Sequence, residues 1–254
     1  MSQGRGSLAL AAAPISTPPL GPVATLAWGA VGVLATFSYL LMGKVVGWTG
    51  AVAPLPKLAD LLPLSHILLA LTVVVAIAAA RKPVLAYLAV TRPGARGVLG
   101  AMGLGILGYV MLGALYFALS RLKAALGAES VQALPATLTG AQAEFGTAAV
   151  LISLWAGMVV AAPIAEEMFY RGFLYRGLAA TRLGAAGAIV LTSVLFGLCH
   201  APGFGWERVV GTGLIGVLLG ILRWRTDNLV VPIVAHATMN LLGATMITLV
   251  LLAA

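Results

Sequence analysis

Residues 147–178 read TAAVLISLWAGMVVAAPIAEEMFYRGFLYRGL, an apolar run of membrane-spanning length that contains two adjacent carboxylates, Glu166 and Glu167. The whole chain has only seven acidic residues. An ionisable group in hydrocarbon costs at least about 2.5–3.5 kcal/mol, and such groups usually mark a functional site. The run therefore predicts a transmembrane helix that carries a site within the bilayer.

The composition extends this prediction to the whole chain. Hydrophobic residues make up 61% of the sequence, charged residues 9%, and the mean hydropathy is +1.06. Soluble domains carry roughly 25% charged residues, so a soluble protein is excluded. We expect an all-α fold, a polytopic membrane bundle of about seven (six to eight) transmembrane helices. The expected spans are Val23–Met42, Leu62–Ala80, Gly97–Leu119, Thr147–Gly177, Ala185–His200, Arg208–Leu222 and Leu229–Leu252.

The chain forms one domain in this interpretation. Residues 1–22, rich in Ser, Pro, Ala and Gly, are expected to be a mobile cytoplasmic tail, and residues 23–254 a single transmembrane domain. The segment Arg121–Leu138 is expected to add an interfacial helix. Glycines are expected to allow close helix contacts, namely Gly97, Gly100, Gly103, Gly105, Gly108, Gly216 and Gly220.

The net charge of +8 does not indicate nucleic-acid binding. The basic residues are scattered singly or in pairs between apolar runs, as topology signals are, and form no basic stripe. With seven spans they orient the N-terminus to the cytoplasm and the C-terminus to the outside. We expect an integral protein of a bacterial-type plasma membrane. The single cysteine, Cys199, excludes an intrachain disulfide and a multi-cysteine metal site.

Helical geometry distinguishes the two glutamates. Glu167 and Arg171 are four residues apart and share a helix face, so they can form an ion pair. Glu166 is rotated away from that face and lacks Arg171 as a partner. A carboxylate without an arginine partner is the better general base, which makes Glu166 the candidate base and the other two residues an orienting pair.

Two further polar sets fall at a similar depth in later helices. Phe196 and His200 form the first, and His236 and Asn240 form the second. Counting 1.5 Å per residue from the connecting turns, we expect both sets to lie level with the glutamates. His66 stands apart near a helix start and is interpreted as an interfacial or packing histidine. The competing interpretation of all these residues is that they form interhelical hydrogen bonds that only hold the bundle together.

The order Glu-Glu-x-x-x-Arg, Phe-x-x-x-His and His-x-x-x-Asn, which starts at Glu166 and ends at Asn240, resembles the CPBP family. That family comprises type II CAAX prenyl endopeptidases and bacteriocin-processing or immunity proteins. The resemblance covers about residues 145–245 and implies an intramembrane endopeptidase. By position it implies that Glu166 and His200 activate water, and that His236 and Asn240 stabilise the oxyanion.

The resemblance leaves the cofactor and the substrate open. We prefer a mechanism without a cofactor; the alternative is Zn²⁺ held by Glu166, His200 and His236, a His₂Glu ligand set. The compact His-Glu-x-x-His helix of many zinc proteases is absent from the sequence. The expected partners are the lipid bilayer and a peptide or protein substrate, with or without a lipid anchor, and no nucleic acid.

Two other functions remain as alternatives. Buried Glu and His residues also form relays in ion- or proton-coupled transporters, although the sequence has none of the internal repeats typical of them. A non-catalytic immunity or scaffold protein could keep the same fold. A cysteine protease that uses Cys199 and His200 is disfavoured, because neighbours in a helix point about 100° apart.

Overall fold

The computed structural model describes residues 17–37, 64–125, 146–201 and 206–253, and all regular structure in these ranges is helical. The predicted all-α bundle is confirmed, and each of the predicted spans overlaps a helix. In chain order the helices outside the long run 147–179 are α1 (Pro22–Thr36), α4 (Leu64–Ala79), α5 (Val84–Tyr87), α6 (Ala95–Ala125), α11 (Gly184–Cys199), α12 (Trp206–Thr226) and α13 (Val230–Ala253).

Within the described ranges, four helices are long and apolar enough to cross a membrane: Ala95–Leu122, Thr147–Ala179, Trp206–Thr226 and Val230–Leu252. The helices α1, α4 and α11 are apolar but shorter. Large apolar side chains face outward along these helices; Val110 and Phe117 of α6 are 59% and 69% exposed. Such surfaces suit lipid, so the chain is an integral membrane protein.

The run 147–179 departs from an ordinary α-helix. It passes through α8 (Thr147–Leu154), the π-helix η1 (Trp155–Ala161), α9 (Ala162–Glu167), the π-helix η2 (Met168–Leu174) and α10 (Tyr175–Ala179). Pro163, in the first turn of α9, has no N–H to donate to a preceding carbonyl. The two glutamates thus lie in a short α-helical segment between two π-helical ones, and π-helical turns are frequent at functional sites.

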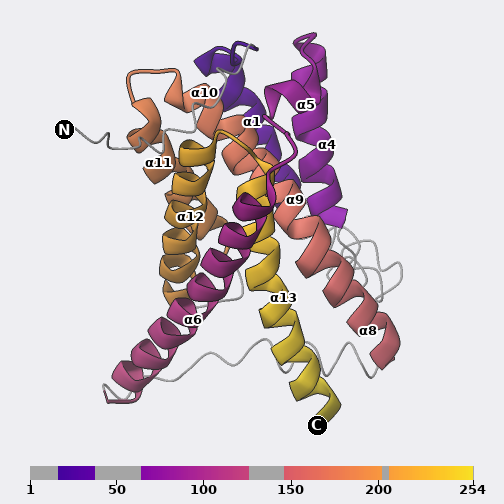
Figure 1. Cartoon of the computed structure of the whole chain (residues 1–254), viewed down its shortest axis with the longest axis vertical. Coiled ribbons are helices and arrows are strands. Elements are labelled where there is room, and N and C mark those ends of the chain that lie inside the picture. The colour runs from indigo at the N-terminus through magenta and orange to yellow at the C-terminus, as the bar shows by residue number, and fades with distance from the viewer. Residues whose placement is uncertain (1–16, 38–63, 126–145, 202–205, 254) are drawn as a thin grey trace, which may run out of the picture.

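The helices around this run form two groups (Figure 1). On one side α1 and α4 pack on each other and on the segments from α9 to α10. On the other side α11 and α12 form an antiparallel pair, and α13 packs against both α6 and η1. The glutamate segment α9 contacts α4 and α13, so helices distant in sequence meet at it.

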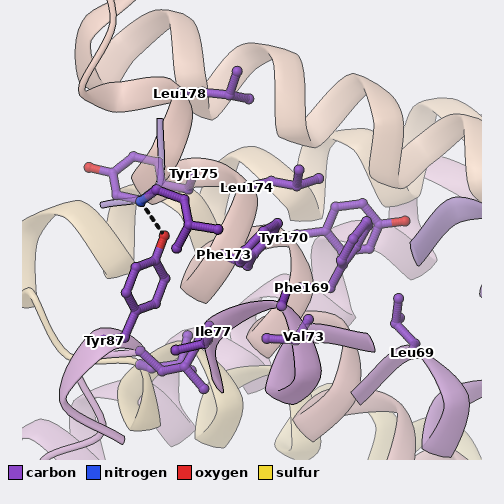
Figure 2. Packing of buried hydrophobic residues seen from close by; sticks show 14 of the residues in the cluster. Leu69, Val73, Ile77, Tyr87, Phe169, Tyr170, Phe173, Leu174, Tyr175 and Leu178 are labelled. Atoms are coloured by element: carbon purple, nitrogen blue, oxygen red, sulfur yellow. Dashed lines mark hydrogen bonds between the residues drawn. The ribbon is translucent and has the colours of Figure 1, made fainter. Parts of the chain in front are cut away.

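The largest buried core includes the interface between α4 and η2. Leu69, Val73 and Ile77 of α4 pack against a cluster that includes Phe169 and Phe173 of η2 (Figure 2). All five side chains are at most 1% exposed. This packing fixes the position of α4 relative to η2.

Some of the predicted glycine contacts are close and others are not. A Cβ at Gly105 would lie 2.5 Å from the Ala235 carbonyl oxygen, so α6 and α13 touch there. Gly108, Gly216 and Gly220 are similarly close to neighbouring helices. The prediction was wrong for Gly100 and Gly103, which face open space among the described residues, and Gly97 meets only Pro93, just before its own helix.

Hydrogen bonds join the loops at one end of the bundle. Arg176 of α10 donates to the Tyr87 and Thr17 carbonyls, and Leu229 N–H donates to the Ala89 carbonyl. Asn228 accepts from the Val230 N–H and so caps α13. The predicted tail lies largely outside the described residues, as does the predicted interfacial helix beyond Ala125.

Candidate active site

Glu167 and Arg171 form a fully buried ion pair. Arg171 Nη1 lies 2.9 Å from Glu167 Oε1, and both side chains are 0% exposed. Arg171 Nη2 donates to the Gly216 carbonyl on α12 at 3.0 Å, and the guanidinium lies 4.6 Å from the Phe196 ring centroid on α11. Arg171 therefore links η2 to α11 and α12. Its partner, Glu167, is the glutamate that helical geometry predicted.

His236 of α13 contacts both glutamates through different ring nitrogens. Its Nδ1 lies 2.9 Å from Glu167 Oε1, and its Nε2 lies 3.7 Å from Glu166 Oε2. Glu167 Oε1 thus contacts both Arg171 and His236. A carboxylate on one imidazole nitrogen fixes the orientation of the ring and directs the other nitrogen toward its target, here Glu166.

Glu166 faces histidines and not the arginine. Its Oε1 lies 3.5 Å from Nε2 of His66 on α4, and its side chain is 12% exposed. The interpretation of His66 as an interfacial or packing residue did not foresee this contact, which arises because α4 packs against α9 and brings the imidazole to the carboxylate. The sequence offered one signal, the scarcity of histidine: the chain has only three.

His200 completes the group from the end of α11. Its Nδ1 lies 2.7 Å from the Phe196 carbonyl oxygen one turn earlier, and its ring packs edge-to-face on Phe196 at 4.7 Å. The Phe196 ring also packs edge-to-face on His236 at 6.0 Å, so it lies against both imidazoles. Glu166 therefore contacts His66 and His236, and His200 joins this group through Phe196.

Asn240 lies one turn beyond His236 and makes an unexpected contact. Its Nδ2 donates to the Met158 carbonyl of η1 at 2.7 Å. In a π-helical pattern the donor for this carbonyl would be the N–H of residue 163, which is a proline. Asn240 therefore supplies a hydrogen bond that the backbone of η1 lacks. The sequence predicted Asn240 either as an oxyanion donor or as part of an interhelical hydrogen bond, and this contact is of the second kind.

Most of these groups lie in a segment that matches a protein-family model. Residues 148–242 match the family model of the type II CAAX prenyl endopeptidase Rce1-like proteins. This match supports a CAAX-type intramembrane protease, a kind of membrane endopeptidase. No curated protein and no solved structure matches the chain. The Rce1-like region contains every candidate site residue from Glu166 to Asn240, while His66 lies outside it.

The donor chemistry of the Rce1-like region suits zinc, but the arrangement does not form a ligand cluster. Carboxylate and imidazole are common zinc ligands, and Nδ1 of both His200 and His236 is held by an oxygen, as in many zinc sites. Across the described ranges, however, no group of three or more His, Cys, Asp or Glu side chains is placed to hold a metal ion. We therefore derive no step through a metal.

Proposed function

We propose that the protein hydrolyses a peptide bond within the membrane, with Glu166 as the general base. The observation that carries this proposal is that the two adjacent glutamates contact different partners. Glu167 contacts Arg171 and His236, whereas the other site glutamate, Glu166, contacts histidines and not the arginine. A site with one neutralised and one available carboxylate suits proton transfer better than a merely structural network would.

In the proposed reaction Glu166 and His200 orient and deprotonate a water molecule. The water oxygen attacks the carbonyl carbon of the scissile bond, and Glu166 takes up the proton. The tetrahedral intermediate then collapses, the C–N bond breaks, and the proton passes to the leaving amine. The Phe196 ring, which packs on both His200 and His236, supports a shared role of these groups at one site.

His236 and Asn240 are the proposed oxyanion donors. Glu167 holds Nδ1 of His236, and Nε2, on the side of Glu166, is the proposed donor to the oxyanion. Asn240 uses one amide hydrogen on Met158 and retains a second. Donors fixed in a water-poor site contribute roughly 2.7–4 kcal/mol each to transition-state stabilisation.

We further propose that the mechanism needs no metal, with zinc on Glu166, His200 and His236 as the alternative. The substrate is a peptide or protein, with or without a lipid anchor. The basic loops between α4 and α6 and between α10 and α11 support a cytoplasmic N-terminus, because positive charge is retained on that side.

The test is a cleavage assay in lipid vesicles with a panel of prenylated and unmodified peptides. Wild-type protein should cleave at least one peptide, and Glu166→Ala should not. Absence of cleavage by the wild type, together with proton or ion flux that depends on Glu166, would instead support the transporter function.

A further inference from the structure

His66 makes a contact with the site that the motifs of the Rce1-like region do not account for. Its Nε2 lies 3.5 Å from Glu166 Oε1, on the opposite carboxylate oxygen from the one that faces His236. We propose that His66 is a positioning residue that holds the Glu166 carboxylate in the orientation required for water activation. This inference rests on the proposed function.

The packing of α4 gives His66 a fixed position. Leu69, one turn further along α4, is 1% exposed, and Val73 after it is fully buried. Residues three and four apart lie on one face of a helix, so His66 shares the face by which α4 packs against the glutamate helix. The backbone that carries the imidazole is thus held by the same core that holds η2 (Figure 2).

The hydrogen-bonding groups of His66 indicate which nitrogen acts. Nδ1 is buried and has no partner among the described residues. The neutral imidazole has one N–H donor, and placing it on Nε2 gives Glu166 Oε1 a donor while Nδ1 carries only a lone pair. Glu166 is then held at Oε1 from α4 and faced at Oε2 by His236 from α13. Both oxygens of the carboxylate are then contacted, and its orientation is set from two helices.

The packing interpretation does not explain this arrangement. A histidine that only filled space would have no reason to direct Nε2 at one of the chain's seven acidic side chains. His66 is 29% exposed and Glu166 12%. The contact is therefore partly shielded from solvent, where an electrostatic interaction has more effect than on a wet surface.

The test compares three variants on α4 by kinetics. His66→Phe keeps the ring volume and removes the donor, His66→Gln keeps a donor, and Thr72→Val is the control because Thr72 Oγ1 donates to Leu68 of its own helix. We expect His66→Phe to lower kcat about 10–100-fold with KM little changed, His66→Gln to recover part of the loss, and Thr72→Val to behave as wild type. Wild-type kcat in His66→Phe would overturn the inference.

A second experiment, in the Glu166→Gln variant, separates this inference from the proposed function. If His66 acts through Glu166, adding His66→Phe to Glu166→Gln should cause little further loss of residual activity. A full additional loss would assign His66 an independent structural role and overturn the inference. Near-normal cleavage by Glu166→Gln alone would instead overturn the proposed function.

The contact can also be measured without turnover. Melting temperatures in detergent are compared for wild type, His66→Phe, Glu166→Leu and the double variant. A contact predicts that the two shifts are not additive, with the double variant melting higher than their sum requires. Additive shifts would overturn the inference even for a protein that cleaves none of the tested peptides.

Discussion

At the scale of single residues, one carboxylate oxygen organises the site. Glu167 Oε1 accepts from Arg171 on its own helix and from His236 on α13. The first contact could be predicted from sequence, because residues four apart on a helix meet whatever the tertiary fold. The contact of His66 with Glu166 could not, since it depends on how α4 docks.

Replacing Arg171 by Ala should destabilise the protein strongly. The change leaves Glu167 as a buried charge that has lost its cation, and breaking such a pair costs about 3–5 kcal/mol. Thermal unfolding in detergent measures the loss. Arg182→Ala, at the exposed turn after α10, is the control and should melt as wild type. Equal melting of the two variants would contradict a stabilising role for the pair.

Asn240→Ala should affect both turnover and stability. Loss of an oxyanion donor lowers kcat by about 10²–10³-fold, and an unsatisfied Met158 carbonyl costs about 1–3 kcal/mol. Adding Pro163→Ala supplies the missing N–H, so it should restore melting but leave kcat low. Recovery of both would show that Asn240 acts only through η1.

A neighbouring bond across the same helices provides the control for Asn240. Trp155 Nε1 donates to Thr248 Oγ1 at 3.0 Å, also between η1 and α13. Thr248→Val should lower stability modestly and leave kcat unchanged. A similar fall in kcat for Thr248→Val would attribute the Asn240 effect to helix packing.

At the scale of elements, hydropathy predicted where the helices lie but not their internal hydrogen bonding. The run 147–179 has the composition of an ordinary span, and π-helical segments have no hydropathy signature. Pro163 was the available signal, because a proline within a helix leaves a carbonyl without its donor. Short α5 (Val84–Tyr87) was not predicted either, since four residues show no helical period.

Gly197 allows a close approach of α11 and α12 near the site. A Cβ at Gly197 would lie 2.5 Å from the Val209 carbonyl oxygen, a rigid backbone atom, whereas one at Gly213 would have its nearest neighbour at 3.7 Å. Gly197→Ala should therefore destabilise the protein by about 1–3 kcal/mol, and Gly213→Ala should be tolerated. Melting of both variants in parallel checks the prediction; equal tolerance would contradict the close approach.

At the scale of the whole molecule, composition was sufficient for the fold class. A chain with 9% charged residues has to bury its helices in lipid, and the order of apolar runs then gives the helices. The meeting of α4, α9, α11 and α13 at one site was only partly predictable. Depth along each helix can be counted from the turns, but the neighbours of each helix are set by packing.

The metal-free mechanism gives a prediction for the purified enzyme. Zinc should be substoichiometric by elemental analysis, and cleavage should survive dialysis against a chelator, because the proposed base and donors are all side chains. Addition of zinc to the dialysed protein serves as the control. One tightly held zinc per chain, lost together with activity and restored by adding the metal back, would make Glu166, His200 and His236 ligands.

The most direct measurement of the central claim is peptide cleavage by purified Glu166→Gln protein in lipid, beside its melting temperature. Glutamine keeps the volume of Glu166 and can still contact His66 and His236, so the fold should be retained. We expect near-wild-type melting and hydrolysis reduced to a small residual rate, because only the base has been removed. Cleavage close to the wild-type rate would contradict it.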